Sequence, residues 1–175
     1  YKVFDALTLV LTPILAFTCD EIWKAMPHDS SRNVESPLFN DIPQGNYIDA
    51  DEAFIEKWDK IHEIRTDVQK ALELARNEKV IGKPLEAKVI LHADGDLADF
   101  LNAELEALPE IFITSAVEVA DGEGAVKGDV AGLSVTIAKA DGEKCERCWK
   151  FSDTVGQDAE HPTLCAHCAQ TMKEL

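Results

Sequence analysis

Four cysteines near the end of the sequence narrowly limit how that region can fold. Cys145 and Cys148 form one Cys-x-x-Cys pair, Cys165 and Cys168 form a second, and sixteen residues separate the pairs. This is zinc-site spacing, because each pair places two thiolates on one tight turn and four thiolates complete a tetrahedron with bonds of about 2.3 Å. A site filled by four protein ligands is structural, whereas a catalytic zinc keeps one position for water. We therefore expect one structural Zn²⁺ that performs no chemistry.

Two other uses of the cysteines have to be weighed against zinc. Two disulfides require an oxidising compartment, whereas an unpaired fifth cysteine, Cys19, lies in an apolar stretch and is typical of a reduced cytosolic chain. A redox Cys-x-x-Cys usually occurs as one pair beside a βαβ pattern, which this region lacks. His161 and His167 could each replace a cysteine as ligand, but four thiolates already suffice. We expect a zinc-binding, cytoplasmic protein.

Composition excludes some functions. The longest apolar stretch, residues 3–17, is interrupted by polar residues and is shorter than the ~20 residues that span a bilayer, so we expect no membrane association. A net charge of −16 opposes free-standing binding to nucleic acid, since phosphate attraction supplies most non-specific affinity. Residues 60–89 are the exception, with 7 basic and 5 acidic groups. Any polyanion must therefore be bound by local basic and aromatic side chains.

The first 84 residues have helical periodicity. Apolar residues recur every three or four positions over residues 2–26, which predicts one helix, kinked at Pro13, that is buried in a bundle. A loop follows, and a second helix is expected to start after a cap at Asp49 and to stop at Gly82 and Pro84. We expect this second helix to pack against the first, so that residues 1–84 form the end of a helical bundle.

The pattern changes after Leu85. Strands are expected at residues 87–92, 111–119 and 133–138, with a helix at 97–108. This βαββ order predicts a small α+β domain over residues 85–143 that positions the zinc finger at residues 144–175. The predicted fold class is therefore α+β in several parts: part of an α-helical bundle, the small βαββ unit and a zinc finger with four cysteine ligands.

Three segments of the sequence resemble one family. Residues 12–15 (Thr-Pro-Ile-Leu) and 17–23 (Phe-Thr-Cys-Asp-Glu-Ile-Trp) are similar to a helix in the anticodon-binding bundle of class I aminoacyl-tRNA synthetases for branched aliphatic amino acids. Residues 71–76 (Ala-Leu-Glu-Leu-Ala-Arg) and 79–87 resemble a helix of isoleucyl-tRNA synthetase, with Pro84 where that family often has Ser. The Cys-Glu-Arg-Cys-Trp segment that starts at Cys145 resembles the C-terminal zinc finger of the bacterial enzymes. A related finger ends formamidopyrimidine-DNA glycosylases, so the finger alone indicates only nucleic-acid contact.

The resemblance implies a function for the parent enzyme and a smaller task for this chain. The parent joins isoleucine to tRNA(Ile) with ATP, and the implied partners here are the tRNA(Ile) anticodon arm and the remainder of the synthetase chain, acting as a monomer. The family's ATP-binding signatures are absent from this sequence, so ATP belongs to a catalytic domain elsewhere and we expect no catalytic residue here. The alternative is a zinc-stabilised protein-interaction or DNA-binding module of a different class.

Candidate RNA-binding residues come from two places. Arg147 and Trp149 flank Cys148 and would offer an unstacked anticodon base a guanidinium fork and a stacking surface, with Lys150 as a phosphate partner. Structural roles are equally open, since Trp149 could cap the finger's small core and Arg147 could pair with Glu146 or a thiolate.

On the second helix, Arg65 and Arg76 lie along one edge of the apolar stripe. They either pair with acidic residues of the first helix or face nucleic acid.

Overall fold

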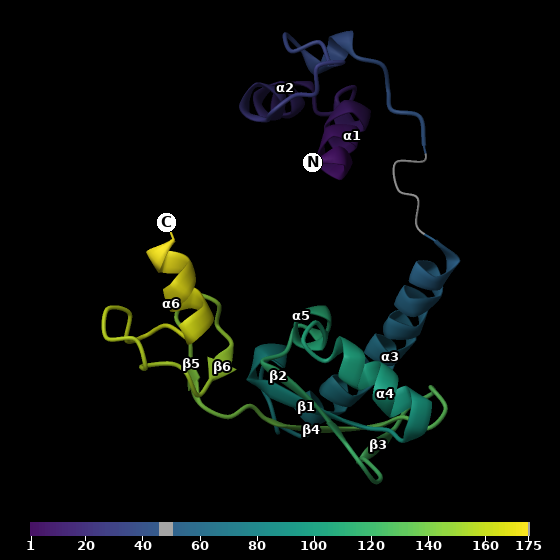
Figure 1. Ribbon diagram of the computed structural model, residues 1–175, viewed down its shortest axis with the longest axis vertical. Coiled ribbons are helices and arrows are strands. Elements are labelled where there is room, and N and C mark those ends of the chain that lie inside the picture. Colours follow the sequence, from purple (N-terminus) through teal and green to yellow (C-terminus); the bar gives the residue numbers. More distant parts are fainter. Residues whose placement is uncertain (46–50, 175) are drawn as a thin grey trace. The chain divides into compact units, whose positions relative to one another are not determined.

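The computed structural model describes residues 1–45 and 51–174. The chain divides into two compact units, residues 1–52 and 53–175 (Figure 1). The cap predicted at Asp49 lies outside the described residues.

The first unit contains two short helices, α1 (Lys2–Leu11) and α2 (Ala16–Ala25), and a 3₁₀ turn, η1 (Pro37–Phe39). Its core consists of Leu9, Trp23 and Met26, and the indole nitrogen of Trp23 donates to the backbone oxygen of Asn33 over 3.1 Å. The prediction of one kinked helix over residues 2–26 is wrong. Pro13 has no N–H to continue the helical ladder, and the chain turns at residues 12–15 before α2 begins.

The second unit begins with a long helix and continues into a sheet. Helix α3 (Glu52–Asn77) leads to a 3₁₀ turn, η2 (Pro84–Glu86), and strand β1 (Ala87–His92), which has the predicted bounds. Helices α4 (Gly95–Glu104) and α5 (Leu108–Phe112) precede β2 (Ala116–Ala120), β3 (Val126–Lys127) and β4 (Ser134–Lys139). The strand order is β2-β1-β4-β3, with β1 parallel to β2 and antiparallel to β4.

The strand predicted at residues 111–119 starts later than expected. Pro109 stands in the first turn of α5, where the fixed φ of proline suits a helix and its missing N–H costs nothing. Ile113 ends α5 in the left-handed conformation (φ 60°), so the extended segment begins only at Ala116.

Helix α3 packs on the sheet, whereas its expected packing against the first helix would join the two units and stays a prediction. Ile64, Val68 and Leu72 are buried in one core with Val89 and Leu91 of β1. Because α3 shares this core with the sheet, the boundary between the two compact units lies near residue 52. The domain boundaries expected from the sequence, at 84/85 and 143/144, remain predictions. The predicted α+β class is confirmed.

The zinc-finger segment completes the second unit. It consists of a two-stranded ribbon, β5 (Glu143–Lys144) and β6 (Phe151–Ser152), and helix α6 (Ala166–Lys173). In Figure 1 this segment is the yellow-green end of the chain, after strand β4.

Candidate metal centre and nucleic-acid interface

The four predicted ligands come together in the finger. Cys145 and Cys148 lie on the turn between β5 and β6, which is closed by the Trp149 N–H donating to the Cys145 oxygen over 2.9 Å. Cys165 caps the start of α6 and Cys168 follows one turn later. All four sulfur atoms lie within 4.8 Å of one another.

The spacing of the sulfur atoms fits one tetrahedral zinc. Bonds of about 2.3 Å imply sulfur–sulfur edges of about 3.8 Å. The Sγ atoms of Cys148 and Cys165 are 3.9 Å apart, far longer than a disulfide bond of about 2.05 Å. All five cysteines are free thiols, so the disulfide alternative does not describe this structure.

Backbone donors favour the thiolate form at one of the four cysteines, Cys145. Burial raises the pKa of the Cys145 thiol, but hydrogen bonds from the N–H groups of Cys148, Cys165 and Arg147 outweigh it and lower that pKa to about 6. Burial raises the pKa of Cys148 to about 12 before any metal is bound. A divalent cation reverses this preference because it stabilises all four thiolates.

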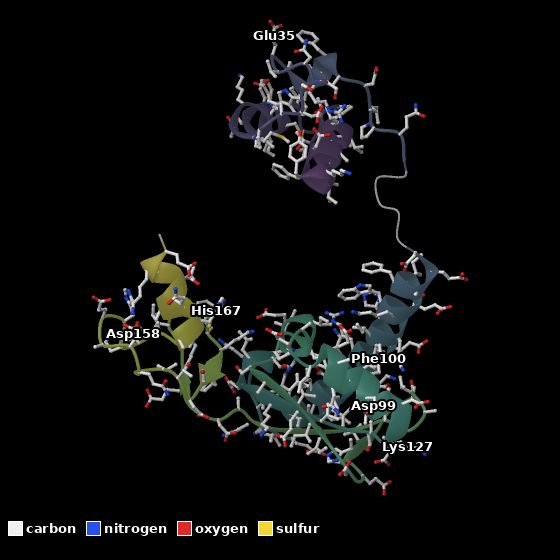
Figure 2. All side chains as sticks on the ribbon, in the orientation of Figure 1. Glu35, Asp99, Phe100, Lys127, Asp158 and His167 are labelled. Carbon is white, nitrogen blue, oxygen red and sulfur yellow. The ribbon has the colours of Figure 1, made fainter. Side chains whose placement is uncertain are left out.

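The histidines are not needed as ligands. The metal-binding group in the described part of the chain consists of the four cysteines alone. His167 is exposed on α6, where Figure 2 labels it.

Trp149 presents its ring to solvent. The side chain is 59% exposed, and the backbone adopts the left-handed conformation (φ 66°) that the tight ligand turn imposes. The finger's buried cluster instead contains the cysteines with Val155 and Leu164. Capping of the finger core, the structural alternative for Trp149, therefore does not fit its exposure.

Arg147 contacts the metal site from outside. Its Nη1 atom lies 3.6 Å from the Sγ atom of Cys168, and the residue is exposed. This contact with a ligand sulfur agrees with the structural alternative for Arg147, and it places a cation beside a centre that would carry a charge of −2 with zinc bound. Part of the guanidinium remains available to another ligand.

Lys150 is already engaged. Its Nζ atom forms an ion pair with the Glu110 carboxylate of α5, and the next residue, Phe151, donates its N–H to the Ser115 hydroxyl over 2.7 Å. Lys150 thus helps to hold the finger on the α+β domain, and a phosphate would have to compete with Glu110.

The two arginines of α3 both have partners within the second unit. Arg65 donates from Nε to the Ile111 oxygen at the end of α5 over 3.0 Å, which suits a cation at a helix C-terminus. Arg76 pairs with Glu73 of its own helix over 3.2 Å. Each arginine therefore has a partner within the second unit, and the expected pairing with acids of the first helix stays a prediction.

A cleft beside Trp149 was not predicted. Six residues line it: Lys83, Leu85, Glu86, Lys144, Trp149 and Phe151. The sequence indicated only that Lys83 lies between Gly82 and Pro84, the residues predicted to end the helix. The residues around Lys83 do not indicate that it lines a cleft with the distant zinc finger.

No helix in the described parts of the chain is both long and apolar enough to cross a membrane.

Comparison with known proteins adds two family matches and many relatives. Residues 142–171 match the zinc finger found in FPG and IleRS, and residues 1–91 match the anticodon-binding domain of tRNA ligase. The finger match and the four clustered sulfurs together support one structural Zn²⁺, as predicted.

The relatives are isoleucine–tRNA ligases. Those of Desulforamulus reducens, Caldanaerobacter subterraneus subsp. tengcongensis and Halalkalibacterium halodurans are 47%, 42% and 44% identical to this chain over 99%, 99% and 98% of its length. The chain spans 19% of the length of each of these relatives. These relatives confirm the resemblance to isoleucyl-tRNA synthetases. Since the anticodon-binding model matches more than half of the residues, this chain belongs to the family of anticodon-binding domains of tRNA ligases.

Proposed function

We propose that this chain binds the anticodon arm of tRNA(Ile) as part of an isoleucine–tRNA ligase. Support comes from its family, from relatives named isoleucine–tRNA ligase, and from a finger of a type shared with those ligases. Activation of isoleucine with ATP then belongs to the part of the ligase outside these residues. The other elements of the proposal are a cytoplasmic location, a monomeric ligase and the rest of the ligase chain as covalent partner.

The observation that carries the proposal is the exposed Trp149 ring on the turn that holds two of the metal ligands. Anticodon loops are single-stranded, and their bases can stack on aromatic rings. One stacked base contributes about 1–3 kcal/mol, and a turn fixed by metal bonds loses little entropy when the base binds. Because the net charge is −16, such local contacts have to replace a broad positive surface.

Arg147 is the proposed source of base discrimination. Its planar guanidinium can donate two hydrogen bonds to a base edge, and the Cys168 contact limits its orientations. Lys150, Arg65 and Arg76 have weaker support, because each is already engaged by a carboxylate or a carbonyl.

The test uses Trp149→Ala in the full-length, zinc-loaded protein. Loss of the stacking surface should weaken tRNA(Ile) binding about 5- to 150-fold, which corresponds to the 1–3 kcal/mol of one stacked base. The KM for tRNA in aminoacylation should rise, while isoleucine-dependent ATP–pyrophosphate exchange stays unchanged. Trp149→Phe is the matched control, since it keeps an aromatic face and should retain most of the affinity.

Unchanged tRNA affinity in both Trp149→Ala and Arg147→Ala would refute the anticodon role. Tighter binding of duplex DNA than of tRNA at equal salt would favour the DNA-binding alternative instead.

A further inference from the structure

The cleft beside Trp149 joins two parts of the second unit. Lys83, Leu85 and Glu86 come from the η2 segment, whereas Lys144, Trp149 and Phe151 come from the finger. Its volume is about 80 Å³. We therefore place a stacked base on the exposed face of Trp149, at the rim of this small cleft.

The two lysines of the cleft differ from the five ion-paired lysines of the second unit. Lys57, Lys70, Lys88, Lys150 and Lys173 each form an ion pair with a carboxylate. Lys83 and Lys144 are exposed, and neither forms an ion pair within residues 1–45 and 51–174. Glu86 lines the same cleft, but its carboxylate accepts a hydrogen bond from the Gly82 N–H over 2.8 Å. The cleft therefore offers two ammonium groups that have no carboxylate partner among the described residues of a strongly acidic protein.

Lys144 also lies next to the proposed stacking surface. Its Nζ atom is 5.2 Å from the centre of the Trp149 ring, within the range of a cation–π contact. Since a phosphate is joined to its base through a single sugar, a cation beside the ring is well placed to meet the phosphate of a stacked nucleotide.

Hydrogen bonds hold the two sides of the cleft together. The Ser115 hydroxyl donates to the Leu85 oxygen over 2.5 Å and accepts the Phe151 N–H over 2.7 Å. One side chain thus links η2, the start of β2 and the finger. The ion pair between Lys150 and Glu110 adds a second link between the finger and the domain. Lys83 is therefore held at a fixed distance from Trp149 although the two residues are far apart in the sequence.

We infer that this cleft is a phosphate-binding subsite for single-stranded RNA, in which Lys83 and Lys144 bind the backbone flanking the nucleotide stacked on Trp149. The inference rests on the proposed function and adds two binding residues to it. Phosphate contacts set the position of the strand and carry no sequence information, so this subsite contributes affinity while Arg147 discriminates.

The test is the salt dependence of tRNA binding by the full-length, zinc-loaded protein. Each phosphate neutralised on a single strand contributes about −0.7 to the slope of log K against log salt concentration. The double variant Lys83→Ala/Lys144→Ala should therefore reduce the magnitude of this slope by about 1.4. It should weaken tRNA(Ile) and a tRNA with another anticodon by the same factor, and Lys83→Arg/Lys144→Arg should restore the slope.

Lys127→Ala is the matched control. Lys127 is exposed, forms no ion pair in the described residues, and lies on β3, at the opposite edge of the sheet from β2, where Figure 2 labels it. It should leave the slope unchanged. The inference is overturned if the double lysine variant keeps the parental slope while Trp149→Ala still weakens binding. If Trp149→Ala is also without effect, the proposed function fails and the subsite with it.

Discussion

Asp67 shows how a single side chain can organise a loop. Its side chain is only 2% exposed, and it accepts hydrogen bonds from the Val130 N–H over 2.9 Å and from Lys70 Nζ over 3.2 Å. The chain also passes close by at Gly128, where a Cβ atom would lie 2.5 Å from Asp67 Oδ2. This carboxylate therefore connects α3 to the loop between β3 and β4.

The pKa of Asp67 predicts how its contribution depends on pH. Burial raises the pKa of this carboxyl, but the N–H groups of Val130 and Asp129, together with Lys70, lower it below the ordinary value of 3.8. A lowered pKa means that the charged form stabilises the fold at pH values above 3.8, and this contribution is lost as the pH falls through the folded-state pKa. Asp67→Asn should thus cost about 1–3 kcal/mol near pH 7.

Urea unfolding of both proteins at several pH values checks this. The difference in unfolding free energy between them should shrink as the pH falls below 3.8, and any loss of zinc affects both proteins alike. A difference that stays constant down to acid pH would mean that the Asp67 charge is irrelevant.

Among the elements of the second unit, the finger is held on the domain by few but specific contacts. The ribbon β5–β6 reaches the domain through the Ser115 hydrogen bonds and the Lys150–Glu110 ion pair. An exposed ion pair contributes little, typically about 0–1 kcal/mol, whereas a hydroxyl satisfying two backbone groups is costly to remove. The orientation of the finger therefore depends chiefly on Ser115.

Ser115→Ala should free the finger without emptying its metal site. Removing the hydroxyl leaves the Phe151 N–H and the Leu85 oxygen without this partner, at a cost of about 1–3 kcal/mol. Amide hydrogen exchange at Phe151 should accelerate, and tRNA affinity should fall, while zinc content remains one ion per chain.

Ser152→Ala is a control within the finger, because the Ser152 hydroxyl bonds to Thr154, two residues along the same segment, and not to the domain within the described residues. It should not change tRNA affinity. Loss of zinc in Ser115→Ala would show that the metal site and the orientation of the finger are not separable.

Across the whole chain, the second unit combines two kinds of stability. The core shared by α3, the sheet and α5 contains fifteen buried residues. The finger buries its cysteines with little else, and segments that small usually fold only with a metal. We therefore expect the apolar core to stabilise α3 and the sheet, and the metal to stabilise the finger, independently of each other.

Cys148→Ser tests this separation. One ligand fewer should greatly weaken zinc binding, and the amides of β5, β6 and α6 should lose protection from exchange. The amides of α3 and β1 should keep theirs, because their core contains no finger residue. Cys19→Ser is the matched control at a buried cysteine outside the metal site, and it should retain zinc. Loss of protection in α3 would contradict independent stability.

Features that depend on neighbours along the chain could be predicted from the residues alone. The two Cys-x-x-Cys turns predicted the metal site because each turn brings its own pair of sulfurs together, and the pattern from Ala87 to His92 predicted the bounds of β1. Other features came only from tertiary contacts: the packing of α3 on the sheet, the pairing of Lys150 with Glu110 forty positions away, and the alignment of Lys83 with Trp149. Such contacts join residues that are far apart in the sequence, and the sequence around one of them does not indicate which distant residue it contacts. The physical reason is that an amphipathic helix or an exposed lysine can pack against or pair with many different partners.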